Sequence, residues 1–335
     1  MRIGLVGTGR IGAFHAKTLQ SLDVVDDIVL NDADAALGTA VAGDLGVSFI
    51  ASLDDLLSDV DALVITTATP GHAPTLRAGI AAGIPTFCEK PVAGTLAESI
   101  ALADLEAATD VPIHIGFQRR FDPGYQRLRE AVAAGELGFI HTIRAATQDQ
   151  SPPHASYIPT SGGLFRDCSI HDFDALRFVT GREVVRAYAV GANKGESFFT
   201  EGGDVDTAAA VLTMDDDTLV VVTATRYNGG GHDVRMEVHG SRGSLMAGLD
   251  DSLAFTSAEP GVAFPPGPRH WSFMERFQPA YVAELTAFAE VVRGGLPSPC
   301  SIADGLQAFR IAQACSISRE EGRVVELAEV ADRSC

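Results

Sequence analysis

The sequence predicts an α/β protein of two domains. The N-terminal domain is expected to hold a doubly wound parallel sheet, and the C-terminal domain to be α+β with a large, mostly antiparallel open sheet. Three observations predict this: a glycine-rich turn follows the first apolar run, strand-like and helix-like segments alternate up to residue 116, and two-residue alternation begins near residue 138. A chain of 335 residues is long enough for two domains of ordinary size.

The first element is a strand over 2–7 (RIGLVG), and after the turn GTGRIG a helix follows over 13–22. Glycines in this strand–turn–helix context form the dinucleotide-binding pattern G-x-G-x-x-G. The first glycine permits the turn, the second lets the backbone approach a pyrophosphate, and the third lets helix and strand pack closely. The predicted cofactor-binding residues of this turn are Gly7, Thr8, Gly9, Arg10, Ile11 and Gly12.

A second strand over 28–30 ends next to Asp32, which lies 20 residues after Gly12. An acid at this place can accept hydrogen bonds from the adenosine ribose hydroxyls and would repel a 2′-phosphate. No arginine stands at Ala33 or Asp34, so NAD is favoured over NADP as the cofactor. The alternative is that Asp32 only caps the helix that starts near Ala33.

Further elements complete an N-terminal domain over residues 1–118. Parallel strands are expected at 62–65, 85–88 and 112–116, with helices between them at 74–82 and 97–108. Ligands bind such sheets at the carboxyl ends of the strands. Three segments fall at those ends, namely 7–12, 66–72 and 89–91.

The C-terminal domain is expected over residues 119–335. Its sheet has about six strands, at 139–147, 184–191, 207–214, 218–226, 234–238 and 244–247. Helices near 165–180 and 278–292 are expected on one face, and a last helix over 302–320 is a candidate to pack back toward the first domain. The proline- and glycine-rich stretch 258–269 is expected to be a long loop. The other face needs cover, which a second copy of the protein would supply.

The segment 162–178 (GGLFRDCSIHDFDALRF) combines an apolar helical stripe with acids and a histidine. In a helix, Asp167 and His171 are four apart and share one face. They could serve chemistry, form a stabilising ion pair, or hold a cation together. No further pair of ligands clusters with them, so no metal site is predicted. Asp172 and Asp174 point to other faces of this helix, where Asp172 could pair with an arginine.

The composition disfavours several classes of partner. A formal net charge of −19 argues against nucleic acid and anionic membranes, because both repel an acidic surface. The five cysteines are odd in number and lack Cys-x-x-Cys spacing, which fits a reducing cytosol better than a disulfide framework. No signal peptide or apolar span of about 20 residues is recognisable. We therefore expect a cytoplasmic protein.

Four motifs carry a family resemblance: GTGRIG at 7–12, EKP at 89–91, GFQRRFDPGY at 116–125 and GGLFRDCSIHDFD at 162–174. Together they resemble the Gfo/Idh/MocA oxidoreductases over most of the chain, and most closely the inositol dehydrogenase branch. The resemblance implies an N-terminal Rossmann domain that binds NAD, and a substrate domain whose open sheet joins dimers or tetramers. It also implies hydride transfer between nicotinamide and a secondary alcohol of a sugar or cyclitol.

The resemblance assigns catalytic roles to Lys90, Asp167 and His171. His171 suits the proton acceptor, because an imidazole has an ordinary pKa of about 6.5. The ammonium of Lys90 would stabilise the developing alkoxide, and Asp167 would bind a neighbouring hydroxyl and hold the imidazole. The resemblance also implies a cis peptide bond between Lys90 and Pro91.

Other site residues follow from the same resemblance. Thr67, Pro70 and His72 are expected on the nicotinamide side, with Glu89 and Lys90 near the nicotinamide ribose. The expected substrate contacts are Gln118, Arg119, Asp149 and His232. His232 stands where inositol dehydrogenases usually have tyrosine, so the pocket is expected to be roomier and more polar, unless the glycine-rich loop around it touches nothing. The histidines at positions 15, 114, 239 and 270 are expected to be structural or exposed.

The function expected is therefore NAD-dependent oxidation or reduction of a cyclitol, polyol or sugar. Two alternatives stay open: an NAD-dependent glycosidase of the same family, and an NAD-sensing regulator without catalysis. Retention of Lys90, Asp167 and His171 argues against the regulator, because a sensor need not keep all three. Neither the substrate nor its stereochemistry is named by the sequence.

Overall fold

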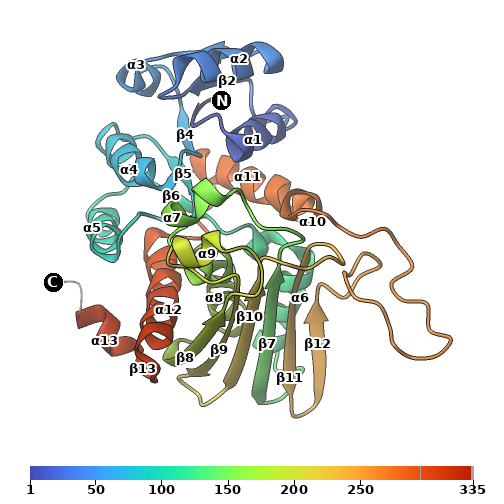
Figure 1. Ribbon diagram of the computed structural model, residues 1–335. Helices are drawn as coiled ribbons and strands as arrows, with labels where there is room; N and C mark the ends of the chain where they lie inside the picture. Colours follow the sequence, from blue (N-terminus) through green and yellow to red (C-terminus); the bar gives the residue numbers. More distant parts are fainter. Residues whose placement is uncertain (295, 333–335) are drawn as a thin grey trace. The chain divides into compact units, whose positions relative to one another are not determined.

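The structure is a computed structural model that describes residues 1–294 and 296–332 (Figure 1). The chain forms two compact units. The N-terminal unit comprises Met1–Gln118 and Ala280–Leu306, and the C-terminal unit comprises Arg119–Pro279 and the chain from Gln307 onward. The expected second domain over 119–335 is thus interrupted, because residues 280–306 belong to the first unit.

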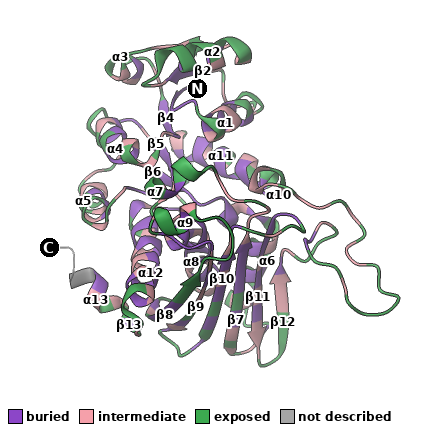
Figure 2. Ribbon diagram, viewed as in Figure 1, coloured by how far each residue is buried: buried purple, intermediate pink, exposed green. Residues whose placement is uncertain are grey.

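The N-terminal unit holds a six-stranded parallel sheet, which confirms the predicted doubly wound architecture. The strand order is β3-β2-β1-β4-β5-β6. The strands β4, β5 and β6 are fully buried, as Figure 2 shows in purple, which is typical of a parallel sheet covered on both faces. Their bounds are β1 (Arg2–Val6), β2 (Asp27–Asn31), β3 (Ser48–Phe49), β4 (Ala62–Ile65), β5 (Thr86–Glu89) and β6 (Ile113–Gly116).

Helices alternate with these strands. Asp34, Ser52 and Thr95 accept hydrogen bonds from the first turns of three of the helices, as N-caps do. The helices are α1 (Arg10–Gln20), α2 (Ala35–Leu45), α3 (Leu53–Leu57), α4 (His72–Ala81), α5 (Leu96–Ala107) and α11 (Gln278–Val292).

The position of α11 corrects one expectation. The sequence analysis placed the helix at 278–292 on the second sheet. Instead, Leu285 and Phe288 of α11 lie in the hydrophobic core of the N-terminal unit, together with Ile3, Leu5 and Phe87 of the parallel sheet.

The C-terminal unit holds a seven-stranded sheet in the order β12-β11-β7-β10-β9-β8-β13. Only β7 and β10 pair in parallel within this described sheet, and the other neighbours are antiparallel. All six expected strands are present within a few residues, and β13 was missed. The bounds are β7 (Ile140–Gln148), β8 (Val184–Ala192), β9 (Thr207–Met214), β10 (Leu219–Thr225), β11 (Asp233–Gly240), β12 (Gly243–Ala247) and β13 (Val325–Glu326).

The two faces of this sheet differ. Val220, Val222 and Ala224 of β10 are buried, whereas their neighbours Leu219 and Val221 are exposed. The buried side packs on helices of the same unit, and Ala189 of β8 donates its backbone N–H to the Ser318 hydroxyl on α12. The helices are α6 (Pro123–Ala133), α7 (Ile158–Ser161), α8 (Ile170–Thr180), α9 (Phe198–Glu201), α10 (Phe273–Arg276), α12 (Ile302–Glu321) and α13 (Leu327–Asp332). The expected loop at 258–269 has neither helix nor strand.

Candidate active site

The glycine-rich turn between β1 and α1 is shaped by two of its three glycines. Gly7 has φ +99°, and a Cβ there would lie 2.5 Å from the Thr67 nitrogen. A Cβ on Gly12 would lie 1.9 Å from the Gly7 carbonyl oxygen. A Cβ on Gly9, by contrast, meets no described atom within 4 Å. The fold therefore requires Gly7 and Gly12, while the open space at Gly9 fits close approach of a ligand.

The start of α1 is suited to an anion. Gly9 is its N-cap, and among the described residues no side chain caps the helix. The unpaired N–H groups of a first helical turn attract a phosphate group. The turn thus fits the pyrophosphate of NAD, as the sequence analysis expected for residues 7–12.

Asp32 is held at the end of β2 by three donors. Its Oδ2 accepts from the Thr8 backbone N–H at 2.6 Å and from the Thr8 hydroxyl at 2.8 Å, and its Oδ1 accepts from the Asp34 N–H at 2.9 Å. Partial burial raises the pKa of Asp32, but the hydrogen bonds from Thr8 and Asp34 outweigh it, and the pKa is lowered. The cap of α2 is Asp34 and not Asp32, so the capping alternative for Asp32 is wrong.

His72 joins the two loops that follow β4 and β5. Its Nδ1 lies 2.6 Å from the Pro91 carbonyl oxygen, and its Nε2 lies 3.0 Å from the Thr67 carbonyl oxygen. Burial lowers the pKa of His72 against the opposing effect of these hydrogen bonds. The Lys90–Pro91 peptide bond is cis, as predicted. His72 therefore binds backbone on both sides, and its expected contact with the cofactor, like those of Thr67 and Pro70, stays a prediction.

Glu89 precedes Lys90 and is paired inside the N-terminal unit. Its Oε1 lies 2.6 Å from His15 Nε2, and its Oε2 accepts from the Lys90 backbone N–H at 3.2 Å. The His15 ring is fully buried and contacts Phe87 and Tyr281 edge-on. His15 therefore orients Glu89, a role that the sequence analysis did not assign.

Arg226 links two carboxylates in the C-terminal unit. Its Nη1 donates to Asp149 Oδ2 at 3.0 Å, and its Nη2 donates to Asp167 Oδ2 at 2.5 Å. The side chain of Arg226 is only 4% exposed. Asp149 directly follows β7 and Arg226 directly follows β10, the two strands that pair in parallel. Sequence reasoning missed Arg226, although an arginine that ends an apolar strand beside a predicted site residue is a usable signal.

Asp167 lies in a π-helical turn, Phe165–Ser169, that runs into α8. The sequence analysis expected an ordinary helical spacing of Asp167 and His171, whereas single π-helical turns are often found at functional sites. Asp167 Oδ1 accepts a hydrogen bond from the Tyr157 hydroxyl at 2.9 Å. His171 follows in the first turn of α8 and is half-buried.

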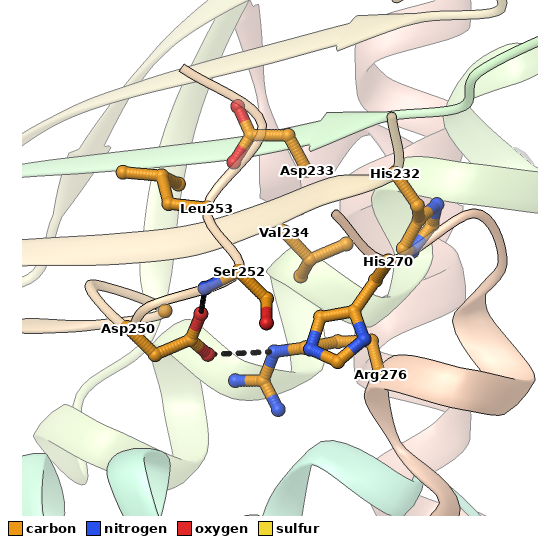
Figure 3. Close-up of a pocket in the computed structure, with 9 residues that line it drawn as sticks. His232, Asp233, Val234, Asp250, Ser252, Leu253, His270 and Arg276 are labelled. Atoms are coloured by element: carbon orange, nitrogen blue, oxygen red, sulfur yellow. Dashed lines mark hydrogen bonds and ion pairs between the residues drawn. The ribbon is translucent and has the colours of Figure 1, made fainter. Parts of the chain in front are cut away.

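His232 lies beside Asp149 at the start of β11. The Nδ1 atom of His232 is 3.4 Å from Asp149 Oδ1, and its backbone N–H donates to the His270 carbonyl at 2.7 Å. His232 and His270 line a small pocket with Asp233, Asp250, Ser252 and Arg276 (Figure 3). Burial raises the pKa of Asp149, but His232 and Arg226 outweigh it, and the pKa is lowered. His232 therefore contacts neighbouring residues of the protein, and its contact with substrate stays a prediction.

Gln118 and Arg119 are both buried. The Arg119 guanidinium donates to Asp172 Oδ1 at 2.5 Å and to the Thr147 hydroxyl at 2.8 Å. Asp172 thus pairs with an arginine, as suggested. Burial raises the pKa of Asp172 in spite of Arg119. Arg119 has a structural partner on α8, and its contact with substrate stays a prediction, as does that of Gln118.

Within residues 1–294 and 296–332, no group of three or more His, Cys, Asp and Glu side chains is placed to hold a metal ion. In the same residues, no helix has the length and apolar character needed to cross a membrane.

Two family models match the chain. An oxidoreductase family with an NAD-binding Rossmann fold matches residues 1–117, and the GFO/IDH/MocA C-terminal domain matches residues 125–246. Together with the glycine turn and Asp32, the first match defines the class of the protein, an NAD-binding oxidoreductase. The second match makes the assignment specific, and the chain belongs to the GFO/IDH/MocA family.

Individual relatives agree with this assignment. The chain is 38% identical to the myo-inositol dehydrogenase Hyg17 of Streptomyces leeuwenhoekii, covering 97% of this chain and 99% of the relative. The crystal structure of a putative myo-inositol dehydrogenase from Sinorhizobium meliloti matches with a TM-score of 0.90 at 33% identity, covering 98% and 99% of the two chains. A scyllo-inositol dehydrogenase from Lactobacillus casei with bound NAD(H) and scyllo-inositol matches with a TM-score of 0.88 at 28% identity, covering 98% and 99%.

Proposed function

We propose that the protein is an NAD-dependent dehydrogenase that transfers hydride between nicotinamide and a secondary alcohol of a cyclitol, polyol or sugar. The observation that carries the proposal is the similarity to inositol dehydrogenases over nearly the full length of both chains, in a sequence that keeps Lys90, Asp167 and His171. The glycine turn at 7–12 and Asp32 would hold NAD, which supplies the hydride acceptor when bound.

Three side chains, His171, Lys90 and Asp167, carry the other parts of the reaction. His171, which is half-buried, accepts the proton of the reacting hydroxyl, because an imidazole is a common general base in proteins. Lys90 hydrogen-bonds the oxygen as negative charge develops on it. Asp167, held by Arg226 and Tyr157, accepts a hydrogen bond from a second hydroxyl of the same ring and so orients the substrate.

The test is a panel of cyclitols and sugars with NAD or NADP, followed by the absorbance of the reduced cofactor. Lys90→Ala and His171→Ala are each expected to lower kcat about 100-fold or more, because the first removes the group that stabilises the developing negative charge and the second removes the general base. Lys17→Ala, on the exposed side of α1, is the control and should keep wild-type rates. Release of a leaving group without net NADH would favour the glycosidase instead, and NAD binding without turnover would favour the regulator.

We further propose that the protein is a homodimer or homotetramer in the cytoplasm, joined through the exposed face of the C-terminal sheet. Tyr188, Val211 and Val221 lie side by side on three neighbouring strands, and each is more than one third exposed. Val190 and Leu219 extend this apolar row. Contiguous apolar surface of this kind marks an interface. The buried cysteines at 88, 168, 300 and 315 are free thiols, which supports a reducing compartment, while Cys335 lies outside the described residues.

Light scattering at micromolar concentration tests the assembly. The wild type should have at least twice the mass of one chain, and Val211→Lys should shift it toward the monomer because it places a charge in the apolar row. Arg186→Lys, which keeps the charge at an exposed position on β8, is the control. A monomeric wild type would contradict the proposal.

A further inference from the structure

Arg226 is the one buried cation that contacts two of the site's predicted acids in the described part of the C-terminal unit. Its guanidinium donates separately to Asp149 and to Asp167, and its side chain is 4% exposed. We infer that Arg226 is a positioning residue that holds Asp167 for the substrate, and that Asp149 anchors Arg226. The inference deepens the proposed dehydrogenase function and rests on it.

Asp149 and Arg226 are held in place by the C-terminal sheet. Gln148 of β7 pairs with Thr225 of β10, and the next residues on these strands are Asp149 and Arg226. The Asp149 backbone N–H donates to the Thr225 carbonyl at 2.9 Å, which extends the pairing by one step. Both side chains are therefore placed by backbone hydrogen bonds, and the planar fork of the guanidinium adds a fixed direction.

Asp167, the residue that Arg226 positions, lies in the π-helical turn Phe165–Ser169. Asp167 is the only one of these three residues that is not at a strand end, and it receives a donor on each oxygen, Arg226 on Oδ2 and the Tyr157 hydroxyl on Oδ1. A carboxylate oxygen can accept about two hydrogen bonds. One contact on each oxygen therefore fixes the direction of the Asp167 carboxylate.

Asp149 is surrounded in a different way. Its Oδ2 also receives the Cys168 thiol at 3.6 Å, and its Oδ1 faces His232 Nδ1 at 3.4 Å. Arg226, Cys168 and His232 thus surround the Asp149 carboxylate, which fits its role as the anchor of Arg226. His232 would then influence substrate choice through Asp149.

Arg226, Asp149 and Asp167 form a charged cluster, and the pKa values of its two carboxylates should depend on the guanidinium. The titratable groups that face Arg226 and its two acids are Tyr157, Cys168 and His232. Burial and the neighbouring Asp167 raise the pKa of Tyr157, so it remains a phenol and a donor at neutral pH. Without the guanidinium, Asp149 and Asp167 would be two carboxylates close together, and like charge raises the pKa of such a pair by about one unit or more.

The experiment compares Arg226→Lys, Arg226→Ala and Tyr157→Phe with a matched control, Arg120→Lys. Arg120 is also buried and donates to both oxygens of Asp174 on α8, at 2.9 and 2.6 Å. The readouts are kcat and KM for the best substrate of the panel, KM for NAD, the pH profile, and the melting temperature.

Arg226→Lys should lower kcat/KM for the substrate on the order of 100-fold, the effect of a small misplacement of a substrate-orienting group, and leave KM for NAD unchanged. In Arg226→Ala, which removes the positive charge, the acidic limb of the pH profile should move up by about one unit. Guanidinium in solution should restore part of the activity of Arg226→Ala. Tyr157→Phe should give a smaller loss in the same direction. Arg120→Lys should lower the melting temperature and leave the pH profile in place.

The inference is overturned if Arg226→Ala keeps the wild-type pH profile, or if the loss of kcat/KM in Arg226→Lys matches that in Arg120→Lys. A titration of ¹³C-labelled aspartate in wild type and Arg226→Ala provides a readout independent of turnover, and unchanged carboxyl pKa values would also overturn it. If the wild type turns over nothing on the panel, the proposed function fails, while this titration still decides whether Arg226 holds the two acids. Should Arg226 variants misfold, Tyr157→Phe decides by the same pH criterion.

Discussion

The substitution Gly9→Ala should weaken NAD binding and leave the stability of the fold nearly unchanged. Gly9 lies in ordinary extended backbone with φ −63° and ψ −171°, and an added Cβ meets no described atom within 4 Å. A Gly-to-Ala change stabilises by about 0.4–1 kcal/mol through the unfolded chain, and the loss of glycine at an N-cap offsets it by a similar amount. The net change in stability should be near zero, which corresponds to a shift in Tm of no more than about 2 °C.

The effect on NAD should be large, because the methyl group stands where the backbone must approach the pyrophosphate. Overfilling a fitted site costs about 1–3 kcal/mol, so the Kd for NAD should rise roughly 5- to 150-fold. Calorimetric titration with NAD and a thermal melt of the same sample measure the two quantities. Gly43→Ala is the matched control on the exposed side of α2, where a Cβ also meets no described atom within 4 Å.

Two further glycine substitutions, Gly43→Ala and Gly12→Ala, serve as controls for Gly9→Ala. Gly43→Ala should raise the Tm slightly, since alanine favours a helix by about 1 kcal/mol over glycine, and leave NAD binding unchanged. Gly12→Ala should instead lower the stability of the protein, because its Cβ would lie 1.9 Å from the Gly7 carbonyl oxygen and the turn itself must shift. Wild-type affinity of Gly9→Ala for NAD would refute the placement of the pyrophosphate.

Three further predictions follow from the same contacts. Asp32→Ser should narrow the preference for NAD over NADP in kcat/KM by about 10-fold or more, since a carboxylate within about 5 Å of a phosphate repels it by more than 1 kcal/mol even in water, and equal ratios in wild type and variant would contradict this. His232→Tyr should change the ratios of kcat/KM among cyclitols and pyranoses while NAD binding stays intact, and unchanged ratios would place His232 outside the pocket. Asp172→Ala should destabilise the protein by about 3–5 kcal/mol in urea unfolding, because it leaves the Arg119 guanidinium buried without its carboxylate. A loss below about 1 kcal/mol would contradict this and mean that the surroundings of Arg119 rearrange.

The parts of the fold that were predicted well depend on local patterns. The glycine turn and the alternating strands of the second sheet are each visible within about ten residues of sequence. The strands β3 and β13 were missed because two residues carry no periodicity. The helix α11 was recognised, but its apolar face does not say which of two sheets it covers, and only the structure assigns Leu285 and Phe288 to the first.

The site shows the same division between local and distant information. Asp167 and His171 stand out because they are neighbours in one motif. Arg226 reaches Asp167 from 59 residues away and Asp149 from 77 residues away, so no spacing rule connects them. The π-helical turn at 165–169 was also invisible, because its residues fit an ordinary helical stripe equally well. Asp149 was found only by family resemblance, and its ion partner required the parallel pairing of β7 and β10.

The return of residues 280–306 to the N-terminal unit has a practical consequence for protein engineering. A cofactor module cut after Gln118 would lack Leu285 and Phe288, which belong to the same core as Ile3 and Leu5. Such a fragment would expose apolar surface and should aggregate on expression. A chimaera that exchanges cofactor modules between relatives must therefore transplant two separate stretches of chain, and its junctions belong at Gln118, Ala280 and Leu306.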